Sequence, residues 1–275
     1  MPETTREDGP PVALTIAGSD SGGGAGIQAD LKTFSAFGVF GTTVITALTS
    51  QNTVGVQGVH AVPIDFIALQ FDSVCTDFPV ASAKVGMLGT SEVIKIVAKK
   101  ATEHSLPHLV LDPVMVAKSG DRLLSEGAIE ALLELLFPLA EVITPNIEEA
   151  LDLLGIDRIA DIEEMKEAAR MLHKLGARCV LLKGGHITKG ALDIFFDGGE
   201  PVIFEGRHID TPHTHGTGCT LSSAIAAGLA QGKPVLEAVG AAKEYIQGAI
   251  EHSLALGKGR GPLNHMYRHL SEKRA

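Results

Sequence analysis

The sequence has 275 residues, of which 45% are hydrophobic, and this is enough for one large α/β domain or two small ones. The formal net charge is −10, and the charged residues form no long runs of one sign. This argues against nucleic acid or an anionic membrane as a general partner, because binding to either needs a basic face. The cysteines Cys75, Cys179 and Cys219 are odd in number and far apart, so we expect reduced thiols in a cytoplasmic protein.

The N-terminal residues 1–11 are polar, carry several prolines and lack the apolar core of a signal peptide. We expect a flexible tail there and a single domain over 12–275, because no linker or internal repeat divides the rest. No apolar run approaches the length of a membrane span. Since Trp is absent and aromatic residues make up only 4%, the core must consist of aliphatic side chains, as in strands buried on both faces.

The first half of the chain alternates between strand and helix patterns. A short apolar run predicts a strand at 12–17, and the spacing of Ile27, Leu31 and Phe34 predicts a helix after a glycine-rich loop. The further elements are strand 39–49, a strand or hairpin over 54–62, a helix from Pro63 to about Phe78, strand 81–88, a helix from Ser91 as N-cap to about His104, and strand 108–111.

The second half continues the alternation, which predicts an α/β fold with a largely parallel sheet. Its elements are helix 126–137, strand 141–144, a short helix to Leu154, a helix from Asp161 to about Leu175, strand 178–182, paired strands 192–196 and 201–204, and helices 218–231 and 234–256. In such sheets ligands bind beyond the carboxyl ends of the strands. The polar or glycine-bearing strand ends should therefore converge on one edge: Gly18, Gln51, Asp112, Asn146, Lys183 and the loop 214–219.

The glycine-rich loop over residues 18–26 follows a buried strand and precedes a helix, as nucleotide-binding loops do. A Walker A motif would need Lys after Gly23, where Gly24 stands, and a Rossmann fingerprint would need Gly or Ala at Ile27. Both motifs fail. We nevertheless expect the loop to let a small ligand approach the backbone, in preference to a flexible connection without a ligand.

A second glycine loop, 214–219, runs into a helix pattern that starts near Gly218. The amides at such a helix start bind anions, and Cys219 is a residue type whose thiolate this position stabilises. The segment therefore fits acyl or phosphoryl chemistry, although a small buried cysteine without a role fits it equally well. A metal site of His213, His215 and Cys219 ranks last, because no second Cys/His cluster completes it.

The blocks together resemble the hydroxymethylpyrimidine/phosphomethylpyrimidine kinases of thiamine biosynthesis over about residues 12–265. The blocks that carry the resemblance are residues 17–33, Asp112-Pro113-Val114-Met115, Thr144-Pro145-Asn146 with Glu149, Lys183-Gly184-Gly185-His186, His215-Gly216-Thr217-Gly218-Cys219-Thr220 and Gly261-Pro262-Leu263-Asn264-His265. The resemblance implies a ribokinase-like three-layer α/β/α sandwich around a mostly parallel sheet, and a homodimer. It also implies ATP-dependent phosphorylation of 4-amino-5-hydroxymethyl-2-methylpyrimidine to its monophosphate and then to its diphosphate.

The resemblance implies roles for the second glycine loop. The amides of Gly216, Thr217, Gly218 and Cys219 would form an anion hole for the moving phosphoryl group. The related superfamily usually has aspartate as a base at the position of Cys219, and a thiol is a usable base only if the helix start lowers its pKa. Because a loose transition state asks little of its base, we expect a modest effect from this thiol.

The resemblance also implies sites for Mg²⁺ and ATP, and each has a structural alternative. Asn146 and Glu149 would place Mg²⁺, with help from Asp112; an ordinary helix cap and a turn-forming Asp-Pro are the alternatives. Lys183 would reach a phosphate and Lys243 would lie beside the nucleotide, whereas solvated lysines are the alternatives.

For the pyrimidine, the resemblance points to Asp30 and Gln51 as hydrogen-bond partners of the ring nitrogens and amino group. The residues expected to line the pocket are Gly18, Ala25, Met87 and Val114. Core filling is an equal alternative for Met87. The histidines His186, His213 and His215 are expected to shape the loops without a chemical role.

Two rival functions come from different classes. Pyridoxal kinase has a similar substrate, but some dual-specific enzymes carry a cysteine in the loop at 116–120, which here reads Val-Ala-Lys-Ser-Gly, so the pyrimidine is favoured. A non-catalytic pyrimidine or nucleotide sensor is disfavoured because the anion-hole, Asn/Glu and cysteine elements are intact. Arg260 stands where family members often have histidine, with no consequence that the sequence reveals.

Overall fold

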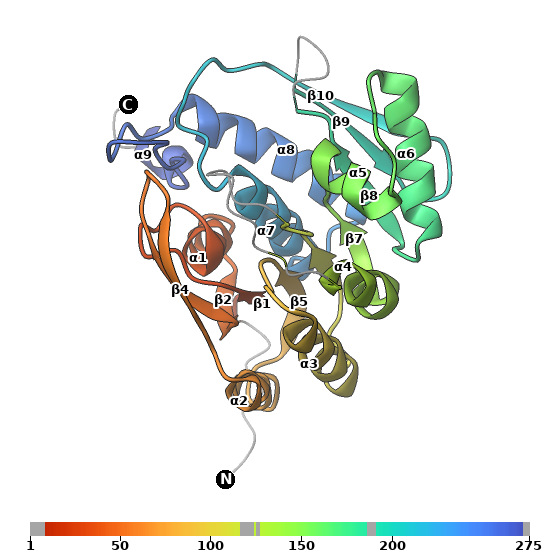
Figure 1. The fold of residues 1–275 in the computed structure, drawn as a ribbon. Helices are drawn as coiled ribbons and strands as arrows, with labels where there is room; N and C mark the ends of the chain where they lie inside the picture. The colour runs from red at the N-terminus through yellow and green to blue at the C-terminus, as the bar shows by residue number, and fades with distance from the viewer. Residues whose placement is uncertain (1–8, 116–123, 125–126, 186–190, 272–275) are drawn as a thin grey trace.

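A mostly parallel sheet forms the centre of the computed structural model, which describes residues 9–115, 124, 127–185 and 191–271 (Figure 1). Its strands are β1 (Val12–Ala17), β2 (Phe40–Ile45), β5 (Val80–Val85), β6 (Leu109–Leu111), β7 (Ala140–Ile143), β8 (Cys179–Lys183), β9 (Ala191–Phe196) and β10 (Val202–Gly206). They lie in the order β10-β9-β8-β7-β6-β5-β1-β2. All pairs from β2 to β8 are parallel, whereas β9 and β10 form the expected antiparallel pair at one edge.

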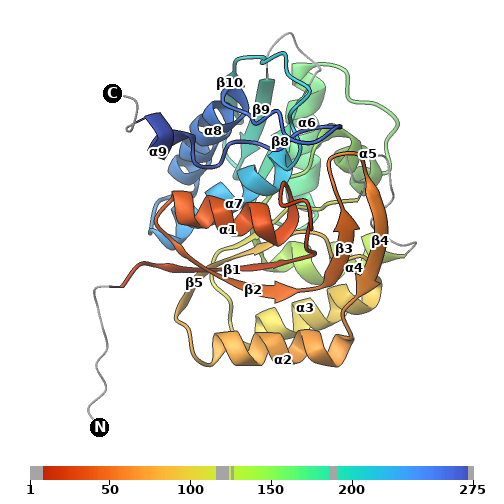
Figure 2. The same cartoon turned by 90° about the vertical axis from the view of Figure 1, so that its left-hand side faces the viewer.

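Helices cover both faces of this sheet, so the chain is a three-layer α/β/α sandwich (Figure 2). One face carries α1 (Gly26–Ala36), α7 (Thr217–Ala230) and α8 (Val235–Glu251), and the other carries α2 (Ile64–Cys75), α3 (Ser91–Glu103), α4 (Ala128–Ala131), α5 (Ile147–Leu154) and α6 (Ile162–Lys174). In β6 and β7, Val110 and Val142 pack on the α7 side, while Leu111 and Ile143 pack on the opposite side. This explains why the strands read as continuous aliphatic runs.

The segment expected as one strand over 39–49 is two strands in different sheets. After β2, the amide of Thr46 still donates to the Ala17 carbonyl, but its side-chain Oγ1 donates to the Met87 carbonyl at 2.8 Å. The chain then leaves the sheet as β3 (Ala47–Gln51), which pairs antiparallel with β4 (Val56–Ala61). Figure 2 shows this ribbon rising at the edge of the molecule beyond the end of β1.

Three helix boundaries also differ from the expected ones. The N-cap of α3 is Thr90, not Ser91, because the Thr90 Oγ1 accepts from the Val93 amide at 3.3 Å. The helix expected over 126–137 begins as α4 and continues as a π-helix (Leu132–Leu136) and a 3-10 turn (Phe137–Leu139), where Pro138 cannot donate a helical hydrogen bond. The helix expected to reach Leu256 ends with α8, and a short α9 (Tyr267–Ser271) follows that the sequence did not indicate.

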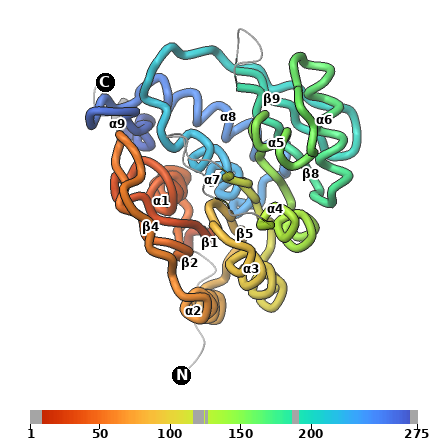
Figure 3. Tube along the Cα trace, in the orientation of Figure 1, coloured from red at the N-terminus to blue at the C-terminus, as the bar shows by residue number. Residues whose placement is uncertain are grey.

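The chain returns to the middle of the sheet with α7, which positions the site. Figure 3 shows the tube of α7 between α1 and the α5–α6 side of the molecule. This helix packs against α1, α8, β1, β5 and β6, and it is buried on all sides because Ala224, Ala226, Ala227 and Gly228 allow close approach. A Cβ on Gly228 would lie 2.9 Å from the Ala238 Cβ of α8.

Some expectations lie outside the described residues: residues 1–8 of the tail, the loop 116–120 and His186. Within the described part of the chain, no helix is both long enough and apolar enough to span a bilayer.

Candidate active site

The first turn of α7 faces the carboxyl ends of the central strands. Its N-cap is Gly216, which has φ of 85° and therefore offers no side chain to cap the amides that follow. A Cβ on Gly216 would overlap the carbonyl oxygen of Gly24 in the other glycine loop, so only glycine fits here. A helix start that no side chain caps is an anion-binding position.

A carboxylate and an ammonium group lie directly beside this turn. A Cβ placed on Gly218 would lie 3.4 Å from Asp112 Oδ2 and 3.6 Å from Lys183 Nζ. Lys183 Nζ itself donates to Asp112 Oδ1 at 3.0 Å, and Thr144 Oγ1 donates to the same oxygen at 3.0 Å. The expected convergence of the ends of β6, β7 and β8 with the loop before α7 is therefore present.

The charge of Asp112 is stabilised although the side chain is buried. Burial would raise the pKa of this carboxyl, but the nearby Lys183 and Lys84 and the hydrogen bonds from Lys183 and Thr144 hold the pKa below its usual value. Asp112 in turn raises the pKa of Lys183 against the effect of burial, with help from Glu149. Both groups are thus ionised at neutral pH.

Asn146 and Glu149 form a capping box at the start of α5. Asn146 Oδ1 accepts from the Glu149 amide, and Glu149 Oε2 accepts from the Asn146 amide, both at 2.8 Å. The cap places Glu149 within electrostatic reach of Asp112 and Lys183. Burial and the Asp112 charge raise the pKa of Glu149 to about 7, with Lys183 opposing them.

Cys219 is half-buried in the first turn of α7. Its environment contradicts the idea that the helix start stabilises a thiolate. Burial and the carboxylates of Asp30 and Asp112 raise the pKa of the thiol above its ordinary value, against the opposing charge of Lys84. The thiol is therefore protonated at neutral pH.

Asp30 lies beneath the site rather than facing it, which corrects the expectation of a direct substrate contact. The side chains of Asp30 and Lys84 are both fully buried and form an ion pair at 2.9 Å. Thr15 Oγ1 and Ser223 Oγ also donate to the Asp30 carboxylate, at 2.6 and 2.7 Å. Strands β1 and β5 and helices α1 and α7 thus meet at one carboxylate, whose oxygens are occupied by protein donors.

Gln51 lies at the end of β3, next to the first glycine loop. Ser21 Oγ donates to the Gln51 carbonyl and accepts from the Gln51 amide, both at 2.8 Å, so the ribbon is tied to the loop. The Gln51 side chain is half-buried, and its Oε1 accepts from Thr49 Oγ1 at 3.3 Å. Gln51 therefore lies beside the first glycine loop, at the end of the separate β3–β4 ribbon and not at the end of a central strand as expected.

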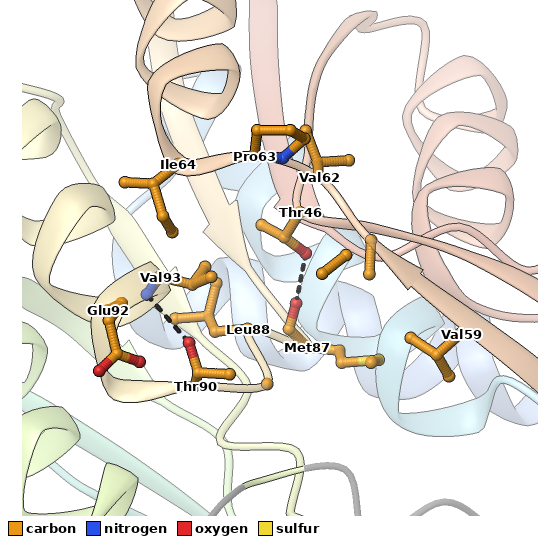
Figure 4. A pocket seen from close by; sticks show the side chains of 13 residues that line it. Thr46, Val59, Val62, Pro63, Ile64, Met87, Leu88, Thr90, Glu92 and Val93 are labelled. Carbon is orange, nitrogen blue, oxygen red and sulfur yellow. Dashed lines mark hydrogen bonds between the residues drawn. The ribbon is translucent and has the colours of Figure 1, made fainter.

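A cavity of about 540 Å³ lies between the β3–β4 ribbon, the strand end after β5 and the start of α3 (Figure 4). Met87 is the only one of the expected pocket residues that lines it, together with mainly apolar side chains such as Val59, Ile64 and Val93. Gly18 backs this wall, since a Cβ there would lie 3.3 Å from Met87 Sδ. Val114 instead lines a small separate hollow with Pro113.

Comparison with known proteins identifies the family of the chain. A sequence model described as phosphomethylpyrimidine kinase matches residues 20–264. The chain belongs to the phosphomethylpyrimidine kinase family. It is 51% identical to the hydroxymethylpyrimidine/phosphomethylpyrimidine kinase of Haemophilus influenzae, over 92% of this chain and 95% of that protein. It is 55% identical to a thiamine biosynthesis bifunctional protein of Geobacter sulfurreducens, over 92% of this chain but only 52% of that protein.

Solved structures agree with this family and confirm the ribokinase-like fold. An ADP complex of Bacillus subtilis pyridoxal kinase superimposes with a TM-score of 0.88 at 44% identity, covering 94% of this chain and 98% of that chain.

Lys243 and Arg260 both have hydrogen-bond partners in the structure. Lys243 Nζ donates to Asp193 Oδ2 at 2.6 Å, and Asp193 Oδ1 accepts from the Gly184 amide at 3.1 Å, so the lysine is tied to β9 rather than solvated. Arg260 is exposed, and its amide donates to the Thr53 carbonyl at 3.0 Å.

Two buried charged residues beside the candidate site, Asp20 and Lys84, were missed in the sequence. Asp20 accepts hydrogen bonds from the amides of Gly22, Gly24 and Ala25, and it is 2% exposed. Lys84 pairs with Asp30. The available signals were an aspartate directly before a glycine run and a lysine inside an apolar strand, because a buried charge must be paired.

Proposed function

We propose that this chain transfers a phosphoryl group from ATP to 4-amino-5-hydroxymethyl-2-methylpyrimidine, and then a second one to the monophosphate, for thiamine biosynthesis. The observation that carries this proposal is the uncapped first turn of α7 beside Asp112 and Lys183, in a chain 51% identical to a kinase of that name. Phosphoryl transfer depends mainly on positioning and on stabilisation of the charge of the moving group. The arrangement supplies both.

The moving phosphoryl group would lie in front of the amides of Gly216, Thr217, Gly218 and Cys219. Lys183 would contribute its positive charge from the end of β8, next to Gly218. Lys243, held by Asp193, would lie beside the nucleotide. Because these donors are fixed before the reaction, they cost no reorganisation when charge develops.

Mg²⁺ would be held by ATP phosphates and by Asp112 and Glu149, with Asn146 fixing Glu149 through the capping box. The ion would neutralise charge on the phosphates. In the described part of the chain no group of three His, Cys, Asp or Glu side chains forms a metal site by itself. This suits Mg²⁺, which usually takes one or two carboxylates and fills the other positions with phosphate and water. The raised pKa of Glu149, caused by burial and by Asp112, also suits it, since a cation would relieve that repulsion.

Cys219 would assist the accepting hydroxyl group as a minor contributor. Its raised pKa, caused mainly by burial, keeps the thiolate scarce at neutral pH. A loose transition state needs little proton removal before the phosphoryl group moves. The protonated thiol would therefore help to position the alcohol, and only the small thiolate fraction could accept the proton that the alcohol loses late in the transfer.

The pyrimidine would bind between the β3–β4 ribbon and the strand ends, with Gln51 hydrogen-bonded to its amino edge. Gly18, Ala25, Met87 and Val114 would surround the ring, and Met87 already lines the apolar cavity beside this position. Asp30 would act from below by fixing Lys84 and α7.

Pyridoxal is the second candidate substrate. The likeness to the Bacillus subtilis pyridoxal kinase, at a TM-score of 0.88, favours it. Gln51 and the sequence of the loop 116–120, which has no cysteine, favour the pyrimidine as the main substrate.

A homodimer in the cytoplasm completes the proposal. Large apolar side chains are exposed on the ribbon and on α2: Leu48 at 47%, Val59 at 54%, Phe66 at 55% and Leu69 at 57%. Exposed apolar side chains of this size are candidates for burial at a subunit interface. Cys75, Cys179 and Cys219 are all free thiols, which suits a reducing compartment.

Incubation of the purified chain with ATP, Mg²⁺ and either alcohol, followed by mass spectrometry, tests the proposal. We expect the hydroxymethylpyrimidine to gain one and then two phosphoryl groups, and pyridoxal to react more slowly. A product with one phosphoryl group, even from excess ATP and the monophosphate, would refute the second step. Absence of ATP consumption with both alcohols would favour the sensor.

A further inference from the structure

Two glycine loops that lie far apart in the sequence are joined at the site by one side-chain pair. His215 Nε2 lies 2.8 Å from Asp20 Oδ2, and their side chains are 16% and 2% exposed. Asp20 belongs to the loop after β1, whereas His215 directly precedes Gly216, the N-cap of α7. The backbones also touch, because Gly24 lies against both His215 and Gly216.

Asp20 is anchored within its own loop. Its Oδ1 accepts from the Gly22 amide at 2.8 Å, and its Oδ2 accepts from the amides of Gly24 and Ala25 at 3.0 and 2.8 Å. Although burial would raise the pKa of this carboxyl, the contact with His215 and the amides of Gly22 and Ala25 lower it, so the carboxylate is ionised. Since Asp20 is 2% exposed and both of its carboxylate oxygens accept from amides of its own loop, the side chain holds this loop in its conformation.

His215 is anchored to the C-terminal segment. Its amide donates to the Gly261 carbonyl at 3.2 Å, and residues His215 and Pro262 form a parallel β-bridge. The ring is thus the link between this anchored strand and the first glycine loop. Because Gly216 is the next residue, the contact of the ring with Asp20 restrains the position of the N-cap of α7 relative to the first glycine loop.

We propose that Asp20 and His215 are positioning residues that fix the distance between the loop on the alcohol side and the phosphoryl-binding turn of α7. This proposal rests on the proposed kinase function. The alcohol would lie against Gly18 and Ala25 of one loop, and the phosphoryl group against Gly216 to Cys219 of the other. Misplacement of reacting groups by about 1 Å can cost about 100-fold in rate. The pair therefore acts on the transfer step and hardly on ATP binding.

The variants His215→Ala, His215→Gln and Asp20→Ala/His215→Ala test this proposal. We expect His215→Ala to lower kcat by about 10- to 100-fold while KM for ATP changes less than about threefold. His215→Gln, which keeps a side-chain donor, should recover most of kcat. The double variant should be no slower than the slower single variant, because both changes break the same link. His104→Ala is the matched control, because it breaks a His–Asp pair of the same length, 2.8 Å to Asp72 of α2, away from both glycine loops, and it should keep kcat within about threefold.

A readout without substrate separates this proposal from the kinase function. We expect amide hydrogen exchange in ligand-free His215→Ala to increase in both 20–26 and 214–220, and His215→Gln to restore protection. Increased exchange in only one loop, or an equal loss of kcat in His104→Ala, would overturn the positioning role. A wild type that shows the paired exchange but phosphorylates neither alcohol would refute the kinase function and leave the link itself established.

Discussion

Lys183 Nζ lies 3.0 Å from Asp112 Oδ1, and both groups lie within van der Waals reach of a Cβ placed on Gly218. An ammonium ion, a carboxylate and the amides of a helix start therefore share one small volume. A cation and helix amides attract phosphate, while the carboxylate orients the cation and suits a metal. The proposed phosphoryl transfer depends on the proximity of these groups.

The role of the Lys183 charge in phosphate binding can be tested by substitution. We expect Lys183→Met to lower kcat/KM for ATP by about 100-fold, because one preorganised donor and one positive charge are lost beside the phosphates. Steady-state kinetics at saturating alcohol measure this. Lys99→Met serves as the control, because Lys99 is 66% exposed on α3, and it should behave like wild type. Equal kinetics in the two variants would contradict a role for Lys183 in phosphate binding.

Glu149 should make stability depend on pH. Its pKa is about 7 in the folded chain, mainly through burial, against an ordinary value of 4.5. The folded state thus holds the proton more tightly, so this contribution to stability is present below about pH 4.5 and is lost as the pH rises through about 7. Glu149→Gln keeps the cap on Asn146 but cannot ionise. When the pH is raised from about 5 to about 8 in the presence of a chelator, the Tm of this variant should fall less than the Tm of the wild type. The same fall in both proteins would contradict the assigned pKa.

Asp30 should behave as a structural residue. We expect Lys84→Met to lower the free energy of unfolding by about 3–5 kcal/mol, because it leaves the Asp30 carboxylate buried without its partner. Lys100→Met is the control: its partner Asp72 is 42% exposed, so the loss of stability should be much smaller. Urea unfolding measures both. If Asp30→Asn raised KM for the pyrimidine without lowering the free energy of unfolding, the result would contradict a purely structural role and support a direct contact of Asp30 with the substrate.

Cys219 should contribute modestly. We expect Cys219→Ala to lower kcat about tenfold with ATP binding unchanged, because the thiol is protonated at neutral pH and the transition state is loose. The wild-type rate should rise above neutral pH as thiolate forms, and the rise should disappear in the variant. Cys75→Ala is the control on a different helix. Unchanged kcat and pH profile in Cys219→Ala would show that the sulfur takes no part.

The order of strands and helices could be predicted because burial on both faces leaves a direct pattern. Runs such as Val12–Ala17 and Cys179–Lys183 are aliphatic on both sides, and Asp161 caps α6 as its position indicated. The break at Thr46 could not be predicted, since Val, Ile and Thr favour strands on either side of it. It depends on a hydrogen bond to Met87, which is remote in sequence.

The convergence of Asp112 and Lys183 could be predicted, because the carboxyl ends of parallel strands meet at one edge of the sheet. The direction of the Asp30 side chain could not be predicted, because a sequence pattern identifies a residue but not where its side chain points. The carboxylate turns inward to Lys84, whose charge inside β5 needs a partner. His215 was expected to shape the loops, but its contact with Asp20 could not be predicted, because this contact joins segments that no local pattern connects.

In the proposed reaction the phosphoryl group binds at the first turn of α7, next to Lys183 and Asp112. The variant Gly218→Ala tests this position. The added methyl group would sit at ordinary contact distances of 3.4 and 3.6 Å from these side chains, and Ala favours a helix, so the Tm should not fall. Gly240→Ala in α8 is the control, with its nearest contact at 3.6 Å. We predict that Gly218→Ala keeps its Tm but loses at least about tenfold in kcat, while Gly240→Ala keeps both. A Gly218→Ala enzyme with wild-type kcat would contradict this binding position.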